Sequence, residues 1–121
     1  MKLAVKLNRN VSMKKILVLS ILTLAVTAWS VRAEDAKALY ENDCAKCHGA
    51  DGKGDTKMGK KLGAKDYTDA TVQAALTDDA AAKAIKEGLK DADGKSLMKP
   101  AEGLADADVK GLVAYMRTFK K

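Results

Sequence analysis

The sequence predicts an all-α fold, and three features of the chain lead to this expectation. Apolar residues recur at helical spacing just before the only histidine, His48, and again near the C-terminus. Almost no segment alternates apolar and polar residues in the way that a half-buried strand does. Glycines gather between the helical stretches, where they favour turns and loops.

The first 33 residues have the composition of a secretory signal peptide. Residues 1–15 carry five basic side chains and no acidic one, and residues 16–28 are almost wholly apolar. Val31 and Ala33 are small residues at the two positions that a signal peptidase reads, which predicts cleavage after Ala33. A retained membrane anchor is the alternative, although the apolar run is shorter than the roughly 20 residues that a span needs.

The charge of the chain depends on this segment. The formal net charge is +6, but six of the 22 basic residues lie within residues 1–33 and all 16 acidic residues lie beyond them. Residues 34–121 are therefore formally neutral, and the basic excess does not indicate nucleic-acid binding. These 88 residues are enough for one domain and too few for two. We expect an exported, periplasmic monomer that does not insert stably in the membrane after cleavage.

The first predicted helix carries the central motif of the chain. Glu34 and Asp35 are expected to cap its start and to favour its positive end. Apolar positions at near-helical spacing then continue to the motif, where the helix is expected to end. The glycines of residues 49–63 predict an extended loop after it.

Three further helices are expected in the second half of the chain. One short piece carries Val72, Ala75 and Leu76, and another runs from about residue 77 or 78 to residue 87, with Gly88 as its stop. Residues 88–105 are expected to be a loop with a turn at Asp93-Gly94. The last helix is expected to start near Asp106 and to bury one apolar stripe. The stripe consists of Val109, Leu112, Val113, Met116 and Phe119.

Five consecutive residues, Cys44-Ala45-Lys46-Cys47-His48, contain both cysteines of the chain and its only histidine. Cys-x-x-Cys-His is the attachment signature of a c-type haem. Residues at i, i+3 and i+4 share one face of a helix, so both sulfurs and the imidazole can meet one ligand. The motif therefore predicts one covalent haem c, with thioether bonds to Cys44 and Cys47 and with its iron bound by His48.

Three other interpretations of the cysteines are weaker. A thioredoxin-like redox pair needs alternating strands and helices, which the pattern does not offer. A structural zinc site needs four ligands, and only three Cys or His residues exist here. A simple disulfide leaves His48 without a role.

The second iron ligand has to be another residue type, because the chain has one histidine. Three methionines lie beyond the predicted signal, and Met116 falls on the apolar stripe of the last helix, where methionine is usually core packing. Met58 lies in the glycine-rich loop, and nothing nearby fixes its position. Met98 lies 50 residues beyond His48, beside the stiffening Pro100, which leaves room for the chain to pass round the haem. We therefore favour Met98 as the second metal ligand and haem contact, with Met58 or an open site as alternatives.

Residues 34–121 resemble the class I, mono-haem cytochrome c family. The resemblance covers the first helix with the haem motif, the Met98-Lys99-Pro100 loop and the terminal helix. It implies a small fold of about four helices wrapped around one covalently bound haem. It also implies that the first and last helices cross at a small residue and an aromatic one. The corresponding residues here are Ala36, Tyr40, Leu112 and Tyr115.

The resemblance is incomplete around the axial histidine. Many family members have a proline whose carbonyl accepts the proton of this histidine, and a tryptophan that bonds a haem propionate. Residues 34–121 have no such proline and no tryptophan. A backbone carbonyl within residues 58–62 and the hydroxyl of Tyr67 are the candidates for the second shell.

The resemblance implies a carrier of single electrons between oxidoreductases, with no catalytic residues and no enzyme activity. The alternative is a haem-based sensor of small ligands, or a weak peroxidase, with a labile sixth ligand. Electrons would leave through the haem edge beside the attachment loop. Residues 46–65 of this region contain six lysines and only two acidic residues, which predicts that the redox partner docks through an acidic surface. A merely solvated loop is the alternative explanation of this charge. The lysines are Lys46, Lys53, Lys57, Lys60, Lys61 and Lys65.

Overall fold

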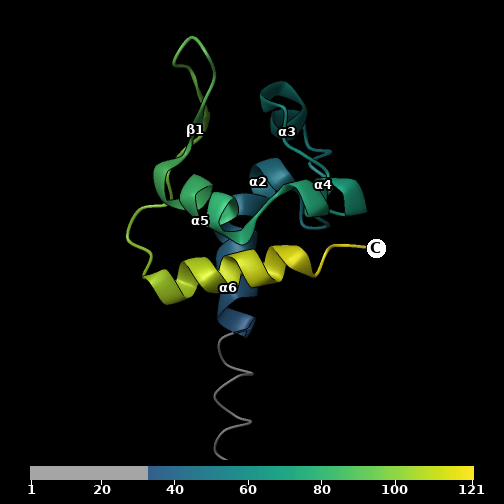
Figure 1. Ribbon diagram of the computed structural model, residues 1–121, viewed down its shortest axis with the longest axis vertical. Coiled ribbons are helices and arrows are strands. Elements are labelled where there is room, and N and C mark those ends of the chain that lie inside the picture. The colour runs from purple at the N-terminus through teal and green to yellow at the C-terminus, as the bar shows by residue number, and fades with distance from the viewer. Residues whose placement is uncertain (1–32) are drawn as a thin grey trace, which may run out of the picture. The chain divides into compact units, whose positions relative to one another are not determined.

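Helices form most of residues 33–121, the part of the chain that the computed structural model describes (Figure 1). The predicted signal peptide, apart from Ala33, falls outside these residues. Two short strands pair as one antiparallel hairpin, so the predicted all-α class is confirmed with this small addition. In chain order, residues 33–39 are helical and are followed by the π-helical turn η1 (Tyr40–Cys44), α2 (Ala45–His48), α3 (Lys57–Leu62), α4 (Ala70–Ala75), α5 (Asp78–Glu87), β1 (Leu89–Lys90), β2 (Ser96–Met98) and α6 (Asp106–Arg117).

The first helical segment and α6 cross one another, as the family resemblance implies (Figure 1). The Tyr40 and Tyr115 rings lie 5.2 Å apart between centroids, and Phe119 packs on both. A Cβ atom at Gly111 would lie 3.3 Å from the Cβ of Ala36, so small residues on both helices allow the close approach. The crossing is confirmed, and Gly111 is the partner of Ala36 that the sequence pattern did not identify.

The apolar stripe of α6 supplies much of the core. Val109, Leu112, Val113 and Met116 are all buried, and Met116 and Val113 pack with Ala81 of α5. Burial of these side chains holds α5 against α6, because each removes apolar surface from water. The expected core role of Met116 is confirmed.

The short helices begin at polar caps, as expected for segments too short to be stable alone. The Asp69 carboxylate accepts hydrogen bonds from the amides of Thr71 and Val72 at the start of α4. The Thr77 hydroxyl accepts the Ala80 amide at the start of α5, and Gly88 ends this helix with φ of 73°. The predictions of a short helix through Val72 and Ala75, of α5 and of the start of α6 are confirmed, although Leu76 lies just beyond α4 in an extended conformation.

Three local predictions are wrong, and the first two concern residues 33–63. Residue 33 is already helical, so Glu34 and Asp35 lie inside the helix and do not cap it. The loop of residues 49–63 contains helix α3, which starts at a Thr56 cap and ends at Gly63 in the left-handed conformation. The glycines had suggested a loop, but only Gly59 lies inside the helix.

The predicted loop of residues 88–105 contains the β1–β2 hairpin. Its turn is held by Asp91, whose carboxylate accepts the amides of Asp93 and Lys95. The strands are only two and three residues long, too short for an alternating pattern to reveal them. After the hairpin, the Ala101 amide donates to the Ile85 carbonyl at 2.8 Å and anchors the returning chain on α5.

Candidate haem site

The Cys44–His48 motif lies where the first helical segment changes its hydrogen-bond pattern. The Ala45 amide donates to the carbonyl of Tyr40, five residues earlier, so η1 contains one residue more than an α-helical turn. Ala36 and Tyr40 are both buried, and in an uninterrupted α-helix Cys44 would continue their face. The additional residue rotates the following side chains by about 100° relative to that face. The π turn therefore separates the face that packs inside the protein from the face that carries the motif.

The two cysteines are free, half-buried thiols. Burial raises the pKa of Cys44 to about 11, and the neighbouring Asp43 and Cys47 raise it further in the same direction. Within residues 33–121, no three His, Cys, Asp or Glu side chains are arranged to hold a metal ion. These observations do not favour the disulfide and zinc interpretations.

His48 is half-buried, and its imidazole is incompletely hydrogen-bonded. Its Nδ1 atom has no hydrogen-bond partner among the described residues. Burial lowers the pKa of His48, so the ring is neutral at pH 7, the form that binds metals. A buried polar atom without a partner is uncommon in a folded protein. Nδ1 is thus unsatisfied in the structure, whereas the neutral ring and the free thiols beside it fit a haem that is attached to both cysteines and bound by this imidazole.

Residues 33–120 match the family model described as Cytochrome c. This chain belongs to the cytochrome c family. It is 32% identical over 88 residues to cytochrome c-554(547) of Halothiobacillus neapolitanus, across 73% of this chain and 97% of that protein. The solved structure of the KustC0563 c-type cytochrome is 38% identical with a TM-score of 0.63, and covers 71% of this chain and 98% of its own. A mutant of that cytochrome is 37% identical with a TM-score of 0.61, over 71% of this chain and 99% of its own.

Membership of the family confirms the predicted fold and the c-type haem, for which Cys44 and Cys47 supply the attachment motif. Within residues 33–121, no helix of this cytochrome is both long and apolar enough to cross a bilayer.

The backbone of the motif in this cytochrome is bound at three successive carbonyls. The carbonyl of Cys47 accepts the Thr56 hydroxyl at 2.8 Å, that of His48 accepts the Gly54 amide at 2.7 Å, and that of Gly49 accepts the Tyr40 hydroxyl at 2.8 Å. Such fully paired carbonyls hold the end of α2 in one conformation. The Thr56 hydroxyl also accepts the Gly59 amide at 2.8 Å, so the residue that caps α3 also fastens this helix to the motif.

The predicted second-shell hydrogen bond of His48 is not present. Neither a carbonyl of residues 58–62 nor the Tyr67 hydroxyl bonds Nδ1. Instead, the Tyr67 ring stacks on the imidazole, with centroids 5.2 Å apart and planes inclined by 19°. Tyr67, a predicted candidate for the second shell, therefore lies beside His48, but it contacts the half-buried imidazole through the face of its ring and not through its hydroxyl.

The three methionines lie in different environments. Met116 is buried in the core, and Met58 on α3 is 38% exposed. Met58 lines a pocket of about 350 Å³ together with Lys46, Lys57 and Lys61. Met98 is half-buried on β2, opposite Leu89 of β1.

The lysines of residues 46–65 are mostly unpaired. Lys60 forms an ion pair with Asp55 at 2.8 Å, and this contact lowers the pKa of the exposed Asp55 carboxyl. Among the described residues, no ion pair involves the other five lysines of this segment. Lys46, Lys57 and Lys61 therefore bring three uncompensated positive charges to one pocket.

Proposed function

We propose that this cytochrome carries single electrons between oxidoreductases outside the cytoplasm and has no enzyme activity of its own. The observation that carries this proposal is the Cys44–His48 motif, with two free thiols and a neutral imidazole presented beyond the π turn. A covalently bound haem would supply an iron that gains and loses one electron. The chain would be exported by the signal at residues 1–33, which is removed after Ala33.

The residues of the chain have distinct roles in this proposal. Cys44 and Cys47 would hold the haem through thioether bonds, and His48 would bind its iron. Met98 would be the second iron ligand, because Met116 belongs to the core and Met58 lies at the surface with the lysines. Methionine is a poor donor to ferric iron, so this ligand raises the reduction potential relative to a second histidine.

The segment that carries Met98 is anchored at both ends, which supports its role as a ligand. A Cβ atom at Gly88 would overlap the Met98 carbonyl, so β1 begins in close contact with the end of β2. Beyond Pro100, the Ala101 amide is bonded to the Ile85 carbonyl. A ligand on an anchored segment stays in place when the iron changes oxidation state, which favours rapid electron exchange.

The first prediction tests covalent attachment. Exported protein is expected to retain haem on the polypeptide through denaturing electrophoresis, and its intact mass should equal the chain from Glu34 plus one haem. Replacing Cys44 or Cys47 with serine should remove one thioether bond, and replacing both should release haem on denaturation. As a control, Thr118→Ser changes an exposed hydroxyl residue at the C-cap of α6 and should leave attachment intact. Haem lost from the unsubstituted protein, with both thiols free to alkylate, would contradict the proposal.

The positive segment at residues 46–65 supports an acidic docking surface on the partner. Unpaired lysines on an exposed surface raise the rate of association with an acidic protein, and salt screens this effect. Replacing these lysines should affect the stability of the fold little, because even an exposed lysine that forms an ion pair adds little stability.

The second prediction concerns these lysines. Replacing Lys53, Lys57 and Lys61 with glutamate is expected to slow the second-order reaction with the physiological partner about tenfold or more at low salt, since charge reversal removes the steering. The absorption spectrum should stay unchanged. Stopped-flow kinetics over a range of ionic strength provides the measurement.

A matched variant separates local steering from net charge. Glutamate at Lys83, Lys110 and Lys120 changes the net charge equally but on α5, on α6 and beyond α6. It is expected to have a much smaller effect on the rate. Equal slowing by both variants would show that only net charge matters, and a rate indifferent to both would show that the lysines are merely solvated.

A further inference from the structure

The main chain of Tyr67 is hydrogen-bonded at both its amide and its carbonyl. Its amide donates to the Gly52 carbonyl at 2.8 Å, and its carbonyl accepts the Gln73 side-chain amide at 2.7 Å. The ring lies between the core cluster, which it packs against, and the His48 imidazole, on which it stacks. The two hydrogen bonds fix the main chain of Tyr67, and packing against the core cluster and the imidazole limits the rotation of its ring.

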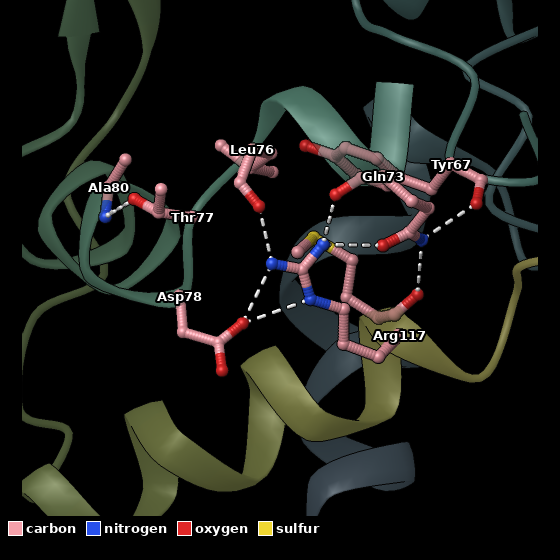
Figure 2. Close-up of polar contacts among 8 residues, drawn as sticks. Tyr67, Gln73, Leu76, Thr77, Asp78, Ala80 and Arg117 are labelled. Carbon is pink, nitrogen blue, oxygen red and sulfur yellow. Dashed lines mark hydrogen bonds and ion pairs between the residues drawn. The ribbon is translucent and has the colours of Figure 1, made fainter. Parts of the chain in front are cut away.

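Gln73 is the only polar side chain classed as buried in the described part of the chain, with 5% of its surface exposed. Its Nε2 donates to the carbonyls of Tyr67 at 2.7 Å and of Met116 at 3.0 Å. Its Oε1 accepts Arg117 Nη1 at 2.7 Å (Figure 2). Because a guanidinium can only donate, the Oε1 atom must face Arg117 and the Nε2 atom must face Tyr67. The amide therefore has a single orientation.

Arg117 is fixed in turn by the α4–α5 junction, as Figure 2 shows. Its Nη1 donates to the Gln73 carbonyl at 2.7 Å, and its Nη2 donates to the Leu76 carbonyl. Its Nε and Nη2 donate to the Asp78 carboxylate at 2.9 and 2.7 Å. The planar fork of the guanidinium satisfies all these acceptors together, which a lysine ammonium cannot do.

We propose that Gln73 is a positioning residue that holds the Tyr67 ring against His48, with Arg117 holding Gln73, and that this chain of contacts sets the reduction potential. The inference rests on the proposed role of His48 as an iron ligand. The negative face of an aromatic ring stabilises positive charge beside it. An imidazole bound to ferric iron is more electron-poor than one bound to ferrous iron, so the stacked ring favours the oxidised form and keeps the potential lower.

The test is a double-mutant cycle on the haem-loaded protein, with the reduction potential as its readout. Tyr67→Leu removes the aromatic face but keeps an apolar side chain that excludes water, and it is expected to raise the potential. Gln73→Met keeps the volume and removes the hydrogen bonds, and it is expected to shift the potential in the same direction. In the Tyr67→Leu background, Gln73→Met is expected to produce no further shift.

Two more variants separate positioning from general stability. Arg117→Lys keeps the charge but not the fork, so it should shift the potential as Gln73→Met does, and it decides the test if Gln73→Met does not fold. Asp78→Asn breaks the exposed ion pair and leaves the Gln73–Tyr67 bond in place. It is expected to lower stability slightly without changing the potential.

The proton NMR spectrum of the reduced protein supplies an independent readout. Nuclear Overhauser contacts between the Tyr67 and His48 rings are expected in the unsubstituted protein and weaker ones in Gln73→Met. Additive shifts of the potential, no shift in Tyr67→Leu, or no contact between the rings would each overturn the inference. Failure of the proposed function is distinct, because His48 ring protons without the large shifts of an iron-bound imidazole would show that His48 is not a ligand.

Discussion

Replacing Met98 with alanine is expected to convert the iron of this cytochrome from low spin towards high spin and to open its sixth position. Alanine has no donor atom, so the iron loses its soft ligand and gains a site for water or a small molecule. The reduction potential should fall by on the order of 0.1 V, part of the roughly 0.8 V that axial ligands span among haem proteins. The ferrous variant should bind carbon monoxide readily. Absorption spectra of both oxidation states and a redox titration provide the measurements.

Met58→Ala is the matched control for this prediction. It removes the same side chain from the surface of α3, where Met58 is 38% exposed, and should leave spectrum, potential and carbon monoxide binding unchanged. If Met58→Ala had these effects and Met98→Ala did not, the assignment of the sixth ligand would be wrong. Rapid carbon monoxide binding by the unsubstituted protein would instead favour a sensor or weak peroxidase with a labile ligand.

Gly59→Ala is expected to destabilise the protein by about 3 kcal/mol, because overpacking at this site would press on backbone. An added Cβ atom would overlap the carbonyl oxygens of Cys47 and Gly54, and would lie 2.9 Å from the Thr56 hydroxyl. The only relief is to move α3 away from the haem motif. A loss of stability would be informative, since alanine inside a helix normally stabilises the protein by roughly 0.5–1 kcal/mol relative to glycine. Denaturant unfolding of the haem-loaded protein, followed by circular dichroism, measures the change.

Gly63→Ala is the control on the same helix. Gly63 has φ of 73°, but an added Cβ atom there meets nothing within 4 Å. This variant should cost only the left-handed backbone penalty, about 1–2 kcal/mol. A neutral or stabilising effect of Gly59→Ala would show that α3 does not rest on the motif as tightly as the contacts indicate.

The amino-acid sequence by itself determined the features that depend on local spacing. Cys44, Cys47 and His48 lie within five residues, so one helical turn presents them together wherever the helix lies. The apolar stripe of α6 and the end of α5 at Gly88 are also local, since helical periodicity and helix stop signals act over a few residues. For this reason the haem motif, the fold class and the helices of the second half were predictable.

Only the tertiary structure decided how the motif is supported. Thr56 was a signal that could have revealed α3, but a helix of one turn and a half is stable only where another part of the chain binds it. Here the Cys47 carbonyl does so, through the Thr56 hydroxyl. No sequence pattern predicted the π turn, which turns the motif away from the face that buries Ala36 and Tyr40.

The contacts around His48 are the clearest example of a feature that the sequence alone could not predict. Neither Gln73 nor Arg117 stands out in the sequence, because a polar residue in a short helix is usually solvated. Gln73 and Arg117 bond one another across 44 residues of chain, and burial at the junction of α4, α5 and α6 makes such hydrogen bonds obligatory. The sequence therefore determined which residues can hold the haem, whereas the packing of distant segments decided which ring lies against the imidazole and what keeps it there.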